Sequence, residues 1–132
     1  MKHRLFFLCL FLMVIGGHGY AQKQGQARID SLLMELPKAK EDSSIVRLSL
    51  MLSANYKTIN PELGINYGMK GLGLAEKMNW QKAIAWAFDN SGSNYKTKSD
   101  YQKSLDYYFK ALKVDVETGN KGGIESVSCN TG

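Results

Sequence analysis

The chain repeats itself at a spacing close to 40 residues, and this repeat limits the possible folds more than any other feature. An Asn-Tyr-Lys-Thr segment recurs 39 residues later, and the stretches that follow recur at an offset of 40. A third copy starts near the C-terminus. Three agreeing offsets predict a solenoid, in which each repeat packs only on its neighbours. The matching segments are 55–58 with 94–97, 60–72 with 100–112, and 84–92 with 124–132.

Each repeat has the pattern of two helices. Asn60-Pro61-Glu62 is a helix start, because Asn can accept from free backbone N–H groups and Pro suits the first helical position. Asp100 is placed to cap the equivalent helix one repeat later. No segment alternates polar and apolar residues as a strand would. The sequence therefore predicts an all-α fold of antiparallel helix pairs, with helices near 43–57, 60–78, 80–97, 101–117 and 121–132.

The second repeat carries the pattern Phe88-x-x-Ser91-Gly92-x-x-Tyr95, followed by Ser104-x-x-x-Tyr108-x-x-Ala111. This pattern resembles the tetratricopeptide repeat, in which small residues let paired helices approach and aromatic residues fill the gaps. Ser91 and Ser104 depart from it, since the family usually has an apolar residue and Ala there. The first repeat departs further, with glycines at 64, 68 and 71. The resemblance implies a right-handed α-solenoid.

The period of 40 residues resembles an extended subclass of this family, whose linkers carry turns such as Asn79-Trp80 and Gly119-Asn120. The resemblance covers residues 42–132. It divides them into repeats at about 42–79 and 80–118 and a truncated third repeat at 119–132. The wider layout is similar to the N-terminal part of exported tetratricopeptide proteins of Bacteroidetes-type bacteria, some of which are sensor histidine kinases. We therefore expect the sequence to be a fragment of a longer protein.

The first 21 residues have the order of a secretory signal peptide. A short basic start precedes 11 apolar residues, Leu5 to Ile15, and a small, turn-prone stretch ends at Ala21. Since a membrane helix needs about 20 apolar residues, we expect cleavage rather than an uncleaved anchor. Residues 22–41 are predicted to be a disordered start, 22–26, followed by a capping helix that Pro37 ends. The predicted location is the periplasm or the outer face of the inner membrane.

Charge and cysteine content narrow the class of partner. Two of the 17 Lys and Arg residues, Lys2 and Arg4, lie in the expected signal, which leaves 15 against 12 Asp and Glu. The surplus is small and spread along the chain, so we expect no nucleic-acid partner. Cys129 is the only cysteine after the signal, which excludes a disulfide within the mature chain. Any membrane contact would come from a span further along a longer protein.

The sequence gives no sign of an enzyme. Both histidines, His3 and His18, lie in the expected signal, so Cys129 has no histidine base to activate it. No cluster of side chains has metal-ligand spacing, and the Gly68-x-x-Gly71-x-Gly73 run is not set between a strand and a helix as a phosphate loop would be. We expect no catalytic residues, no metal and no cofactor.

The tetratricopeptide resemblance implies a concave face built from the first helix of each repeat, on which a peptide lies. On this basis Asn90 and Asn130 occupy ligand-binding positions, since an amide side chain can both donate to and accept from a peptide backbone. Trp86, Ser93 and Thr97 are expected on the same face. The alternatives are that the two Asn residues only solvate the concave surface or bond neighbouring helices, and that Trp86 belongs to the core.

The predicted function is binding of a protein or peptide on the extracytoplasmic side, as the sensory or interaction region of a longer signalling protein. One alternative is a structural role, either as a dimerisation module or as a spacer, which would make a homodimer the relevant partner. A stand-alone exported adaptor is another. Sensing of a lipid or small molecule between repeats is a third, although no charged clamp supports it.

Overall fold

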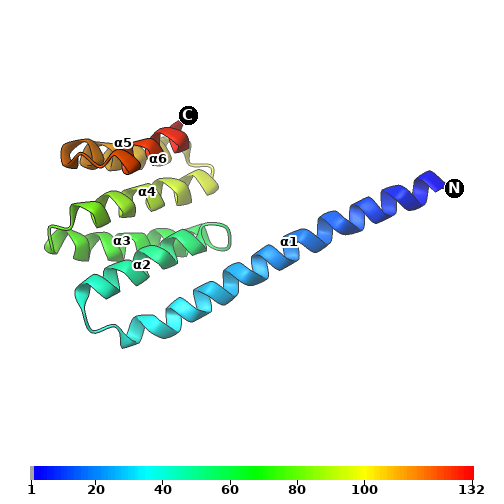
Figure 1. Ribbon diagram of the computed structural model, residues 1–132, viewed down its shortest axis with the longest axis horizontal. Coiled ribbons are helices and arrows are strands. Elements are labelled where there is room, and N and C mark those ends of the chain that lie inside the picture. Colours follow the sequence, from blue (N-terminus) through cyan, green and yellow to red (C-terminus); the bar gives the residue numbers. More distant parts are fainter. Residues whose placement is uncertain (1) are drawn as a thin grey trace.

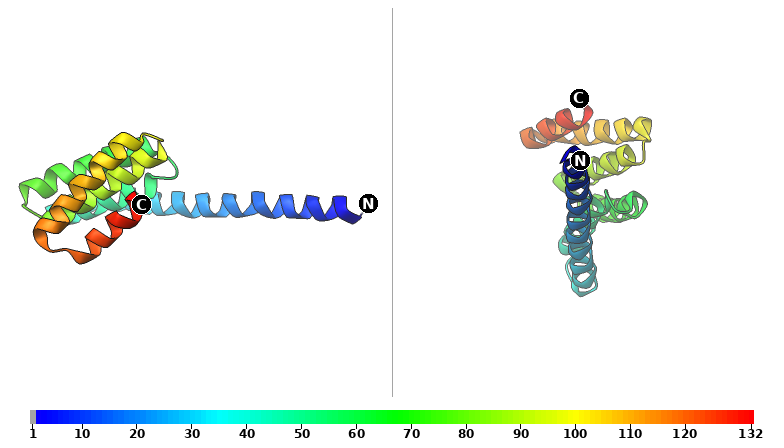
Figure 2. Two further views of the ribbon diagram at one scale, coloured as in Figure 1. Left: turned by 90° about the horizontal axis from the view of Figure 1, so that it is seen from above. Right: turned by 90° about the vertical axis from the view of Figure 1, so that its right-hand side faces the viewer.

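The computed structural model describes the backbone of residues 2–132 and the side chains of residues 19–132. The described part is all-helical, as predicted, and contains no strand. Helices α2 to α6 pack side by side in chain order, while α1 extends far beyond them and contacts them only near its end (Figures 1 and 2). The elements are α1 (Lys2–Glu35), the 3-10 turn η1 (Leu36–Lys38), α2 (Asp42–Tyr56), α3 (Pro61–Lys77), α4 (Gln81–Thr97), α5 (Tyr101–Thr118) and α6 (Lys121–Thr131).

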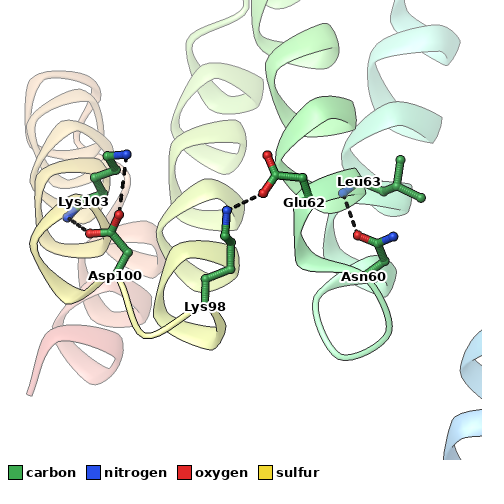
Figure 3. A network of polar contacts seen from close by, with 6 residues as sticks. All are labelled: Asn60, Glu62, Leu63, Lys98, Asp100 and Lys103. Carbon is green, nitrogen blue, oxygen red and sulfur yellow. Dashed lines mark hydrogen bonds and ion pairs between the residues drawn. The ribbon is translucent and has the colours of Figure 1, made fainter.

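Consecutive helices run antiparallel. At one interface, Lys98 directly after α4 pairs with Glu62 at the start of α3 (Figure 3). At the next, Ser104 Oγ near the start of α5 donates to the carbonyl oxygen of Gly92, late in α4, at 2.8 Å. Helices α2, α4 and α6 therefore share one direction, and α3 and α5 share the other.

The helix starts follow local chemistry. Asn60 Oδ1 accepts from Leu63 N at 3.2 Å, and Asp100 Oδ1 accepts from Lys103 N at 3.3 Å (Figure 3), so both predicted caps are confirmed. Each bond satisfies one of the N–H groups that a helix start leaves without a partner. The residues that precede the four helices α3 to α6 are 20 apart, at 60, 80, 100 and 120.

The helix ends show the same 20-residue spacing. Asn79, Ser99 and Gly119 adopt left-handed backbone conformations, with φ of 53°, 62° and 67°. After each of them, the next backbone N–H bonds back to a carbonyl oxygen five residues earlier, at 2.8 to 3.0 Å. This is the hydrogen bond of a Schellman cap, which satisfies a free carbonyl at the helix end. One connection is thus used three times, and it turns the chain back on itself at each step.

The core lies in three clusters along the row of helices. The central one joins α2, α3 and α4 through Val46, Leu50, Leu72 and neighbouring alanines. A second lies between α5 and α6, around Tyr108 and Val127. The third joins α1 to α2. No single central core exists among the described residues. Each cluster lies between helices that are neighbours in the row.

The N-terminal part differs from the prediction. Residues 22–26, expected to be disordered, are helical and continue α1. Most side chains here favour helix, and Gln26 Nε2 donates to Asp30 Oδ1 one turn later at 2.8 Å. Further along, Ile29 and Leu32 are buried against α2. Met1 and the side chains of residues 1–18, on which the signal-peptide prediction depends, lie outside the described part, so that prediction stays untested.

Candidate binding site

Three hollows lie along the side of the molecule formed by α2, α4 and α6, and α4 contributes to all of them. The first lies between α2 and the start of α4 and measures about 310 Å³. Trp86 is 37% exposed beside it, and the Arg47 guanidinium lies 5.7 Å from the centre of the Trp80 ring. This hollow is mainly apolar, with two cations at its edge. Its lining residues are Arg47, Met51, Trp80, Lys82, Ala83 and Trp86.

The second hollow, of about 140 Å³, lies on the other side of Trp86, where α4 meets α5 and α6. Asp115 is almost fully buried beside it, and Asn120 Nδ2 donates to its Oδ1 at 2.7 Å. A side chain at Gly123 would collide with the Asp115 carboxylate, which explains the glycine at this position. Asp89 and Lys82 also line this hollow, which therefore carries more acidic than basic groups.

The carboxyl of Asp89 has a perturbed acidity. Partial burial raises its pKa above the ordinary value, and the nearby Asp115 raises it further. The hydrogen bond from Asn130 Nδ2, at 3.0 Å, and the Lys57 charge oppose this rise. The surroundings of Asp89 therefore favour its protonated form more than water would.

The third hollow, of about 360 Å³, lies at the opposite ends of the same helices and is polar. Ser93 Oγ and Tyr108 Oη share a hydrogen bond of 3.0 Å there, and Lys96 Nζ donates to the backbone oxygen of Asn130 at 3.0 Å. Its amines and hydroxyls suit a polar or anionic group better than an apolar one. Its lining residues are Lys57, Ser93, Lys96, Thr97, Tyr108 and Asn130.

The structure brings together only part of the predicted site. Ser93, Thr97 and Asn130 line the third hollow, whereas Trp86 lies between the first and the second. Asn90 reaches none of them. It is 7% exposed, and its Nδ2 donates to the Leu50 carbonyl oxygen of α2 at 2.9 Å. We therefore correct the expectation for Asn90, whose amide joins two neighbouring helices.

Sequence reasoning missed the partners of Trp86. The sequence pattern assigns Arg47 and Met51 only to a helix, and Trp80 only to a linker turn and the helix start that follows it. The offset of 39 that matches residues 55–58 with 94–97 also matches Arg47 with Trp86. That register could have indicated that both side chains lie on the same side of adjacent first helices.

Within the part of the chain that the structure describes, no three His, Cys, Asp or Glu side chains are grouped closely enough to hold a metal ion. Among the same residues, no helix combines the length and the apolar character needed to cross a membrane. No known family model matches the chain, and no curated protein is significantly similar to it.

Proposed function

We propose that this chain is a right-handed solenoid of the tetratricopeptide type, and that the side formed by α2, α4 and α6 binds a protein or peptide segment. The 40-residue repeat and the antiparallel pairing of consecutive helices support the architecture. The three hollows on one side, each formed by more than one helix, support the binding role.

One observation carries the proposal, and it is the position of Trp86. A tryptophan that is 37% exposed loses the hydrophobic stabilisation that full burial would give. Trp86 stands between an apolar and an acidic hollow, where a bound chain would cover its indole. Tryptophan is also among the residues that most often dominate the energy of protein interfaces. A peptide laid across α2, α4 and α6 would use this side chain as its central contact.

From the sequence we further propose that the module is exported and acts outside the cytoplasm, as the interaction region of a longer signalling protein and without enzymatic activity of its own. The basic start and apolar run before Ala21 support export. A fusion to alkaline phosphatase, which is active only after export, tests this. Phosphatase activity that depends on residues 5–15 is expected, and an inactive fusion would contradict export.

The binding role can be tested with a phage-displayed library of random 12-residue peptides, selected on the full chain. We expect enriched sequences that lose binding to Trp86→Ala and keep binding to Phe109→Ala. Phe109 is a matched control, since it is an exposed aromatic residue on α5 that lines none of the three hollows. If no sequence is enriched, or if Phe109→Ala removes binding and Trp86→Ala does not, the proposed face is wrong.

A second function is favoured by the surface of α5. Tyr101, Leu105, Phe109 and Val116 lie on one stripe of this helix and are between 39% and 62% exposed. Contiguous exposed apolar residues commonly mark an interaction site. Asp106 and Lys113 flank Phe109 on either side, so two antiparallel copies of α5 would bring opposite charges together.

This surface suits a homodimer, in which the chain would serve as a dimerisation module or spacer. Analytical ultracentrifugation of the full chain tests it. A concentration-dependent dimer that Phe109→Asp dissociates and Trp86→Ala leaves intact would support this second function. A monomer over the whole concentration range would exclude it.

A further inference from the structure

The apolar hollow between α2 and α4 is the part of the surface whose chemistry is most specific. Met51, Ala83 and the two indoles of Trp80 and Trp86 line it. Its volume of about 310 Å³ is at the lower end of the range for ligand sites, so it suits an inserted side chain better than a large cofactor. An apolar side chain placed there would cover the exposed part of Trp86.

Two cations stand at the edge of this hollow, Arg47 from α2 and Lys82 from α4. Among the described residues, the ion pairs are Lys98 with Glu62 and Lys103 with Asp100, so neither Arg47 nor Lys82 has an acidic partner. The cation–π contact of the Arg47 guanidinium with the Trp80 ring restrains its position. A guanidinium in a fixed position is well suited to bind a carboxylate through two parallel hydrogen bonds.

The other two hollows differ in character. The hollow beyond Trp86 has Asp89 and Asp115 in its wall against the single cation Lys82, so it suits a carboxylate less well. The third is lined mainly by lysines, hydroxyls and an amide, and the one aromatic side chain in its lining, Tyr108, is almost fully buried. Of the three hollows, only the one between α2 and α4 has a mainly apolar wall with two cations and no acidic residue in its lining.

We infer that this hollow recognises an apolar side chain next to a carboxylate, so that the bound peptide is of the hydrophobic-acidic class. The apolar group packs between Trp80 and Trp86, and the carboxylate pairs with Arg47 and Lys82. An acidic side chain and a C-terminal carboxylate would both supply this chemistry. The inference rests on the proposed peptide-binding function and specifies the ligand of the same face.

The test uses synthetic peptides with a Gly-Ser frame and blocked ends, in which the central pair is Phe-Asp, Phe-Asn, Phe-Lys or Ala-Asp. A fifth peptide ends in Phe with a free carboxylate, and its amide is the control. Binding to the full chain is followed by the shifts of the two indole N–H signals in NMR spectra. We expect Phe-Asp to bind about tenfold more tightly than Phe-Asn, because it adds a charge-assisted hydrogen bond.

Variants of the chain then test whether Arg47 binds the carboxylate of the peptide. Arg47→Gln should bring the affinity for Phe-Asp down to that for Phe-Asn, while Lys113→Gln, which changes an exposed lysine on α5, should leave the ratio unchanged. Circular dichroism checks that each variant is folded. If the acidic side chain binds and the free C-terminus does not, the carboxylate comes from a side chain. The reverse result assigns it to a chain end.

Equal affinities for Phe-Asp, Phe-Asn and Phe-Lys would overturn the inference, as would the absence of any indole shift with the Phe-Asp and free-carboxylate peptides. Either result rejects the ligand class only, and the phage selection still tests separately whether the chain binds peptides. Peptides enriched there without a hydrophobic-acidic pair, but dependent on Trp86, would keep the binding face and reject this ligand class. The two failures are therefore distinguishable.

Discussion

The helix pairs α2–α3 and α4–α5 occupy equivalent places in the repeat, yet side chains of different size fill their interfaces. In α4–α5, the ring of Tyr108 is buried against Gly92, where a Cβ atom would lie 2.7 Å from the ring. In α2–α3 the aromatic residue is replaced by Gly68, which faces Ser53. A Cβ atom at Gly68 would lie 2.9 Å from Ser53 Oγ. One pair combines a large side chain with a glycine, and the other combines two small residues.

The difference shows that equivalent positions in the repeat fix neither the residue nor the summed side-chain volume at the interface. Where Tyr108 fills the interface, α4 must supply a glycine. Where α3 supplies a glycine, its backbone comes close to side chains of α2 and α4. Protein interiors are packed without large voids, so each solution excludes the residues of the other. Four substitutions test these differences, and their expected effects on stability decrease in the order given.

Tyr108→Ala should have the largest effect. It removes a ring that is 2% exposed and leaves the Gly92 side of the interface empty. Loss of a buried aromatic side chain typically costs about 3–5 kcal/mol of unfolding free energy. Urea unfolding followed by circular dichroism measures the change. Tyr101→Ala, at an exposed position of the same helix, is the control and should cost far less.

Gly64→Ala, in α3, should lower the free energy of unfolding by about 1–3 kcal/mol, a typical cost of overpacking. The new Cβ atom would lie 2.1 Å from Oδ1 of Asn94, a buried side chain whose Nδ2 donates to the Asn90 oxygen at 2.8 Å. Gly73→Ala is the matched control in the same helix, since no atom lies within 4 Å of its added Cβ. This control should gain up to about 1 kcal/mol from helix propensity. Equal effects of the two substitutions would contradict the close approach.

Ser99→Gly should stabilise the chain by about 1 kcal/mol, because a residue with a Cβ atom at φ of 62° is strained and glycine is not. Thermal unfolding measures the gain. The same change at Asn79 should gain less, since Asn tolerates the left-handed region better than Ser. A loss of stability in Ser99→Gly would show that the serine side chain has a contact that outweighs the strain.

Asp89→Asn tests another difference between the pairs, since the offset of 39 matches Asp89 with the fully buried Leu50. Burial raises the folded pKa of Asp89, so its contribution to stability is complete below the unfolded pKa of about 3.9 and is lost as pH rises through the folded pKa. Asp89→Asn should therefore be more stable than the natural chain at neutral pH, with a gain that shrinks in acid. The exposed Asp106→Asn controls for net charge.

The sequence was informative wherever structure is decided locally. Asn60 and Asp100 were recognisable as caps, because a cap depends on one side chain and the next three residues. The helices were recognisable from the repeat itself. The hydrogen bond of Asn90 could not be predicted, because its acceptor is a backbone oxygen 40 residues away in the sequence. The packing of α2 against α4 brings the two groups together. The contact of Arg47 with the Trp80 ring could not be predicted for the same reason.

The central claim is that a peptide binds on α2, α4 and α6 around Trp86, and NMR of the ¹⁵N-labelled full chain tests it most directly. The two indole N–H signals are assigned with Trp86→Phe, and a peptide from the phage selection is then titrated. We predict that both indole signals shift, together with backbone amides of α2 and α4. Unchanged indole signals, with shifts confined to residues 101–116 of α5, would contradict the account and place the peptide on the apolar stripe instead.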